Sequence, residues 1–172
     1  SCDVYVKGSY ANNTNVRSDS DVDVAVECRE VIYYDPHTPG AAPSATPYTG
    51  VCTPAKLRSE LVAALRAKFG HAVDTSGSTA IHVTSSSARV EADVVPCFKY
   101  RYYFSSTNFR EGAKVFRTDG ASIVNHSALQ LSRGTAKNNR TNYFYKKTVR
   151  ILKRAENAML YAGYHRKVPS FI

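Results

Sequence analysis

Two carboxylates separated by a single residue, Asp21 and Asp23, lie in an alternating run of valines. The alternation predicts a strand, and side chains at positions i and i+2 of a strand share one face. Two carboxylates on one face repel each other unless a cation lies between them, and Mg²⁺ or Mn²⁺ prefers such oxygen ligands. We therefore expect Asp21 and Asp23 to bind a divalent metal ion, while Val22, Val24 and Val26 point into a core.

A glycine–serine pair, Gly8 and Ser9, precedes Asp21 by eleven intervening residues. Glycine lets the backbone approach a ligand closely, and the serine hydroxyl and N–H can hold phosphate oxygens. The apolar residues 4–6 predict a strand that leads into this turn. A phosphate-holding turn beside paired carboxylates is a layout that suits metal-assisted nucleotidyl transfer.

A second acidic strand is predicted over residues 89–96, where apolar positions 90, 92 and 94 alternate with polar ones. Its acidic residues, Glu91 and Asp93, fall on one face. Either carboxylate would complete a metal site with Asp21 and Asp23 if the two strands are neighbours.

The residues Gly8-Ser9-Tyr10, Thr14 and Ser20-Asp21-Val22-Asp23 together resemble the signature of the DNA polymerase beta-like nucleotidyltransferase superfamily. Within that superfamily, the chain resembles the bacterial relatives of cyclic GMP-AMP synthase and oligoadenylate synthase, the CD-NTase family. The resemblance implies a mixed, mostly antiparallel sheet flanked by helices, an α/β (α+β) fold. It also implies a long basic central helix and a further helical lobe, which we expect to be missing from this chain.

The resemblance implies that Asp21, Asp23 and Asp93 are the catalytic residues and share two Mg²⁺ or Mn²⁺ ions. Asp93 is preferred to Glu91 because the family places an apolar pair and a proline directly after the catalytic residue, as Val94-Val95-Pro96 do here. The ions would activate an acceptor hydroxyl and steady the leaving pyrophosphate. Gly8 and Ser9 would hold nucleotide phosphates.

The C-terminal part of the chain is strongly basic, with nine Lys and Arg against one Glu between residues 137 and 167. Helical spacing predicts a buried apolar stripe, with the basic residues on an adjacent face. The predicted stripe consists of Phe144, Thr148, Ile151, Leu152, Ala155 and Met159. The resemblance implies that one lysine of this helix holds nucleotide phosphates, for which we expect Lys153 first and Lys146 or Arg150 next. It also implies that Ser170 contacts the phosphates and that Phe171 stacks on the base.

The net charge of +9 over 172 residues favours a polyanionic partner, either a nucleoside triphosphate or a nucleic acid. No apolar run approaches the length of a membrane span, and we expect a cytoplasmic protein. We divide the chain into a catalytic core, residues 1–135, and a basic helix with the start of a helical lobe, residues 136–172. Residues 33–53 are predicted to form a flexible insertion loop, and residues 54–69 a helix. The aromatic run 98–104 is predicted to be a packed strand or a surface on which bases stack.

The resemblance implies the synthesis of a cyclic di- or trinucleotide second messenger from nucleoside triphosphates (ATP, GTP, CTP or UTP), in bacterial antiphage defence. A nucleotidyltransferase that modifies RNA or a small molecule would share the same carboxylates. A catalytically silent module that binds nucleic acid through the basic helix is the alternative from another class. The bases and linkage of the product, and the need for an activator protein or nucleic acid, stay open.

Overall fold

The computed structural model describes residues 1–16 and 21–164. Within these residues seven strands form one sheet in the order β1-β2-β5-β4-β3, with β6 and β7 added beside β5. Among the strands of the described residues, only β2 and β5 pair in parallel, and the other pairs are antiparallel. This confirms the expected mixed, mostly antiparallel sheet. The strands are β1 (Cys2–Lys7), β2 (Val22–Pro36), β3 (Val73–Asp74), β4 (Ile81–Val83), β5 (Ala92–Tyr103), β6 (Phe109–Phe116) and β7 (Ser122–Asn125).

Strand β5 differs from its predicted extent at both ends. It begins at Ala92 rather than at residue 89, so Glu91 lies just before it, and it continues through the aromatic run to Tyr103. Tyr100 and Tyr103 are buried, which confirms the packed-strand alternative for this part of the run. Its long partner β2 reaches Pro36, so the first four residues of the predicted insertion loop belong to a strand. Pairing with β5 overrides the turn-forming composition of this segment.

Both faces of the sheet contribute to the core. Helix α2 (Pro54–Phe69) begins as predicted, with the Thr53 hydroxyl accepting from the Lys56 N–H and proline in the first turn. Its Leu57 packs against Cys28, Val31 and Phe98. On the opposite face a second cluster consists of Ala25, Val95, Cys97, Ala113 and Val115.

The prediction that the valines of β2 point into a core is met only in part. Val22, Val24 and Val26 are only half-buried. Helix α2 contacts their face of the sheet further along the strand, near Cys28 and Val31. The deepest burial on β2 falls on Ala25 and Cys28, at 1 % and 0 % exposure.

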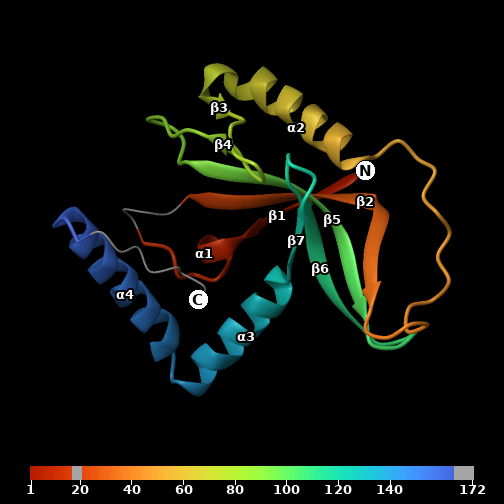
Figure 1. The fold of residues 1–172 in the computed structure, drawn as a ribbon. Coiled ribbons are helices and arrows are strands. Elements are labelled where there is room, and N and C mark those ends of the chain that lie inside the picture. The colour runs from red at the N-terminus through yellow and green to blue at the C-terminus, as the bar shows by residue number, and fades with distance from the viewer. Residues whose placement is uncertain (17–20, 165–172) are drawn as a thin grey trace.

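Within the described residues, the basic segment consists of the end of one helix and a second, long helix. Helix α3 (Ser127–Arg140) ends before Thr141, and α4 (Phe144–Tyr161) starts after a corner where Asn142 and Tyr143 have positive φ. The predicted boundary between residues 135 and 136 therefore falls inside α3. In Figure 1, α2 covers one side of the sheet, and α3 and α4 lie on the other side, with α4 beside the short helix α1 (Gly8–Ala11).

The predicted buried stripe of α4 is exposed, which corrects the sequence interpretation. Phe144, Ile151, Leu152 and Met159 are between 55 % and 66 % exposed, whereas Val149 on another face is 3 % exposed. The helical period of the sequence shows that a helix has two faces. It does not show which face packs against the rest of the fold. Here the half-buried face carries the cationic residues Lys146, Arg150 and Lys153. Within the described residues, no helix is both long and apolar enough to cross a membrane.

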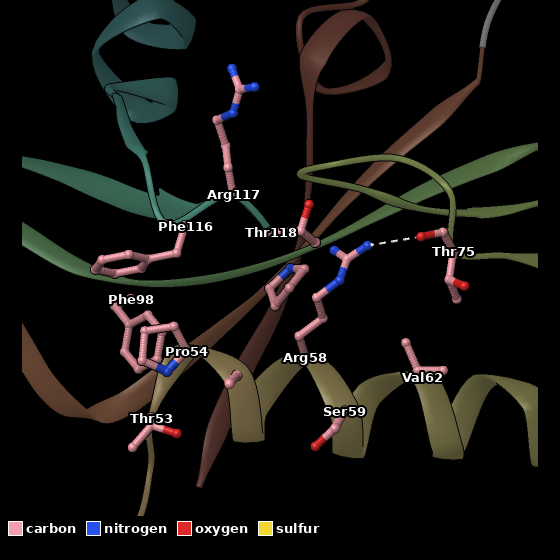
Figure 2. Close-up of a pocket in the computed structure, with 13 residues that line it drawn as sticks. Thr53, Pro54, Arg58, Ser59, Val62, Thr75, Phe98, Phe116, Arg117 and Thr118 are labelled. Atoms are coloured by element: carbon pink, nitrogen blue, oxygen red, sulfur yellow. Dashed lines mark hydrogen bonds between the residues drawn. The ribbon is translucent and has the colours of Figure 1, made fainter.

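A cavity of about 770 Å³ lies on the α2 side of the sheet. It is lined by residues of α2, of β5 and of the turn between β6 and β7. Figure 2 shows Arg58 reaching from α2 toward Thr75. Its guanidinium donates to the carbonyls of Thr75, Gly77, Thr79 and Ala80, so backbone groups already occupy its donors. Of the predicted site residues that the structure describes, none lines this cavity.

Candidate active site

The strand registers place five titratable residues in one row across the sheet. Lys7 on β1 pairs with Asp23 on β2, and Asp23 pairs with Asp93 on β5. Asp93 in turn pairs with His82 on β4, and His82 pairs with Asp74 on β3. The sheet therefore brings together Asp23 and Asp93, two of the three predicted metal ligands. Lys7 and His82 flank this pair of carboxylates.

Gly8 lies directly against the carboxylate of Asp23. Its φ is +67°, and a Cβ atom at this position would overlap with Asp23 Oδ2. Any larger residue would therefore suffer both an unfavourable backbone conformation and a steric clash. The following turn is held by the Asn12 N–H, which donates to the Gly8 carbonyl, and by the Thr14 N–H, which donates to the Ser9 carbonyl. The close approach of the Asp23 carboxylate thus favours glycine at position 8.

Three side chains at this end of the sheet could together hold a metal ion. One ligand atom each from Asp21, His82 and Asp93 lies within 4.8 Å of the others. The Nδ1 atom of His82 is 2.9 Å from Asp93 Oδ1. Asp23 adjoins this group through its register with Asp93. The donor set is rich in oxygen and suits a hard divalent cation.

The electrostatics of the site also favour a cation. Burial raises the pKa of Asp21, and a hydrogen bond with Glu91 and the negative charges of Glu91 and Asp93 raise it further. Burial likewise raises the pKa of Asp23, as does Asp93, whereas Lys7 and Lys153 act in the opposite direction. Each carboxylate is thus harder to ionise than in water, and a bound cation would relieve this cost. The residues present fit Mg²⁺ or Mn²⁺.

Glu91, the alternative third carboxylate, lies close to the same site. Its side chain contacts Asp21, and its carbonyl accepts from the Val22 N–H. Asp93, by contrast, stands inside the row, beside Asp23 and His82. The geometry therefore favours Asp93 as the carboxylate facing Asp23, with Glu91 at the margin beside Asp21.

Sequence reasoning did not single out His82. The hydrogen bond to Asp93 is the main cause that raises its pKa, and the charges of Asp93, Asp21 and Glu91 add to the shift. A lone histidine in the three-residue strand Ile81–Val83 carries no motif. Its position beside Asp93 becomes visible only through the pairing of β4 with β5.

Helix α4 brings its cationic face toward the end of the sheet that carries Asp21, Asp23 and Asp93, which we call the acidic end. The positive charge of Lys153 acts on Asp23, and Arg150 Nη1 donates to the Asn13 carbonyl at 2.7 Å. Lys146 is half-buried, and its backbone N–H donates to Asn138 Oδ1. The remaining two predicted nucleotide-binding residues, Ser170 and Phe171, lie outside the described residues.

Comparison with known proteins agrees with this geometry. Residues 132–172 match the family model of the cGAS/DncV-like nucleotidyltransferase C-terminal helical domain. The chain is 37 % identical over 156 residues to the cyclic GMP-AMP synthase CdnE03 of Staphylococcus schleiferi, a match that covers 87 % of this chain and 48 % of that protein. The chain belongs to the cGAS/DncV-like nucleotidyltransferases.

Solved structures of cGAS/DncV-like nucleotidyltransferases share the fold. The Rhodothermus marinus CdnE c-UMP-AMP synthase, solved with Apcpp and Upnpp, aligns with a TM-score of 0.81 at 30 % identity, over 99 % of this chain and 59 % of its own. The Elizabethkingia meningoseptica CdnE cyclic dinucleotide synthase, solved with GTP and Apcpp, aligns with a TM-score of 0.77 at 32 % identity, over 99 % and 58 %. The chain spans between 48 % and 59 % of the length of these relatives.

Proposed function

We propose that the protein carrying this chain is a metal-dependent nucleotidyltransferase that makes a cyclic di- or trinucleotide from nucleoside triphosphates and releases pyrophosphate. The observation that carries the proposal is the pairing of Asp23 with Asp93, beside Asp21, at the end of the sheet where α4 presents its cations. Relatives that are 31–37 % identical are named as synthases of cyclic nucleotides, which supports this reaction class.

In this proposal Asp21, Asp23 and Asp93 hold two Mg²⁺ or Mn²⁺ ions. Such ions polarise the α-phosphate and lower the pKa of an acceptor hydroxyl. Gly8 leaves room for the Asp23 carboxylate, and the Ser9 hydroxyl and backbone hold phosphate oxygens. Three carboxylates would repel a triphosphate even beside Lys7 and Lys153, so the metal ions would support binding as well as chemistry.

The cations of α4 would bind the triphosphate. Lys153 is the best-placed of them, because its charge already acts on Asp23. Arg150 donates to the Asn13 carbonyl and so supports the loop that follows Gly8 and Ser9. Lys146 is the further candidate. Ser170 and Phe171 keep their proposed contacts with phosphates and base.

The base choice needs measurement, because the relatives differ in product. Their names specify cyclic GMP-AMP, cyclic dipyrimidine, cyclic dipurine and cyclic UMP-AMP synthesis. A cytoplasmic role in antiphage defence, with or without an activator protein or nucleic acid, is part of the proposal that rests on family resemblance alone.

The deciding experiment incubates the full-length protein with four labelled nucleoside triphosphates and Mg²⁺ or Mn²⁺, followed by phosphatase. We expect a phosphatase-resistant product from the wild type and none from Asp23→Asn. Asp74→Asn is the matched control, because Asp74 belongs to the same row but its carboxylate accepts from Ser76. A wild type without such a product, with candidate activators also present, would refute the proposal.

The basic face of α4 also favours a second candidate, binding to a nucleic acid. Such binding would weaken steeply with salt, because phosphate contacts release counterions. Binding to RNA that persists in the Asp21→Asn/Asp23→Asn double variant, together with no cyclic product, would favour this candidate.

A further inference from the structure

His82 occupies a fixed position beside the catalytic carboxylates. It lies at the middle of β4, between Ile81 and Val83, which are 0 % and 2 % exposed. Ile81 and Val83 therefore lie on the buried face of the short strand. Because side chains alternate along a strand, His82 lies on the other face. Its side chain, which is 31 % exposed, lies on the same side as the row of acids. The position of the imidazole is therefore set by a packed core.

The neighbouring acids differ in their relation to His82. Asp74, its partner on β3, accepts both from the Ser76 N–H at 2.9 Å and from the Ser76 hydroxyl at 3.0 Å. Glu91 contacts Asp21 and accepts from the Ser85 hydroxyl. Asp93 Oδ1 is 2.9 Å from His82 Nδ1, which is a good hydrogen-bond distance. The geometry thus pairs the imidazole specifically with Asp93.

We propose that His82 is a positioning residue for Asp93, an inference that rests on the proposed function. The Nδ1–H group donates to Asp93 Oδ1 and fixes the rotation of the carboxylate. Asp93 would then offer its second oxygen, Oδ2, to a cation that Asp21 and Asp23 would also hold. Groups that orient a ligand in this way typically contribute a factor of about 10–100 in metal affinity or activity.

The test compares two substitutions at this position. His82→Leu fills a similar space but removes the donor, whereas in His82→Asn the side-chain N–H can donate to Asp93 from nearly the same place. Mn²⁺ binding to the full-length protein is measured by the loss of the free-ion electron paramagnetic resonance signal, without nucleotide. We expect His82→Leu to bind Mn²⁺ about 10–100-fold more weakly, and His82→Asn to retain most of the affinity.

Thermal unfolding of each variant identifies a change in folding. Asp74→Asn, on the other side of His82, should leave Mn²⁺ affinity unchanged. If His82→Leu does not fold, His82→Ala replaces it. The proposal would be overturned if the folded His82→Leu or His82→Ala variant bound Mn²⁺ as tightly as the wild type. It would also be overturned if His82→Asn bound Mn²⁺ as weakly as the variant without a donor.

Product formation separates this proposal from the proposed function. A wild type that makes a cyclic product, with Mn²⁺ binding unaffected by His82→Leu, would refute the role of His82 alone. Weaker Mn²⁺ binding in His82→Leu, without a cyclic product from the wild type, would support the role of His82 and refute the proposed reaction. In an active enzyme we expect His82→Leu to lower kcat more than it changes the KM for nucleotide.

Discussion

At the scale of single residues, the site depends on how tightly Gly8 and Asp23 approach each other. The backbone of Gly8 adopts a φ of +67° and contacts the carboxylate that the proposal assigns to the metal ions. A side chain at this position would displace Asp23 from its place beside Asp93. Gly120 provides a comparison, because it has a φ of +87° but a Cβ there would meet no described atom within 4 Å.

We therefore expect Gly8→Ala to abolish most activity and to destabilise the protein more than Gly120→Ala does. Backbone strain alone should cost about 1 kcal/mol in both variants, and the steric overlap adds to this only at Gly8. Denaturant unfolding and product formation measure the two effects. Equal losses of stability, with activity retained in Gly8→Ala, would contradict the close approach.

The raised pKa of Asp23 predicts a conflict between stability and function. A carboxylate whose pKa is higher in the folded than in the unfolded protein destabilises the fold when it is ionised. Asp23→Asn should therefore raise the melting temperature near pH 7 in the absence of divalent metal. The gain should shrink as the pH falls through the raised pKa, because the wild-type carboxylate then becomes neutral too. Calorimetry across this pH range measures the effect.

Ionisation of Asp74 should have the opposite effect on stability from ionisation of Asp23. The Ser76 N–H is the main cause that lowers the pKa of Asp74, so its ionised form stabilises the fold above the unfolded-state pKa. Asp74→Asn should not stabilise the protein at neutral pH, and any loss should disappear as the pH falls through the lowered pKa. A stabilising Asp74→Asn, or an Asp23→Asn whose gain grows in acid, would contradict these signs.

At the scale of elements, local patterns predicted what depends on local physics. The start of α2 follows from Thr53 and Pro54. The predictions failed where contacts between residues far apart in the sequence determine the local structure. The corner after α3 contains no proline or glycine that would predict it, and the choice of the buried face of α4 depends on tertiary contacts.

The corner between α3 and α4 carries backbone strain. Tyr143 has a φ of 64° and is 62 % exposed, so its side chain gains little to offset a conformation that bulky residues avoid. Tyr143→Gly should therefore stabilise the protein by up to about 1 kcal/mol. Asn142→Gly is the control and should gain less, because asparagine tolerates this region of φ. Chemical denaturation of both variants provides the comparison, and a destabilised Tyr143→Gly would contradict the strain.

At the scale of the whole molecule, the site combines segments that are far apart in the sequence. The carboxylate motif and the residues after Asp93 were predictable because they resemble a family signature. The register of β2 with β5, which places Asp23 beside Asp93, was not deducible from spacing across about 70 residues. His82 was missed for the same reason, since only the pairing of β4 with β5 reveals it.

The contact of α4 with the acidic end of the sheet predicts the effect of removing one cation. Lys153→Met should raise the KM for nucleoside triphosphate by roughly 10-fold or more, because a charge-assisted contact with phosphate is lost. Arg154→Met changes the same charge on an adjacent, exposed position of α4 and should have little effect. Steady-state kinetics with the full-length protein tests both variants. Similar KM values for the two would show that Lys153 acts only through net charge.

The strained corner also gives α4 the mechanical character of a lever arm. A helix rises about 1.5 Å per residue, so Lys153 stands roughly 15 Å along α4 from the corner at Tyr143. A rotation of about 10° there would carry Lys153 sideways by roughly 2.5 Å, nearly as far as a hydrogen bond is long. The hydrogen bond from Arg150 to the Asn13 carbonyl lies between the corner and Lys153, where it limits such a rotation. Substitutions at the corner would thus alter nucleotide affinity from residues to which the proposal gives no contact with the nucleotide.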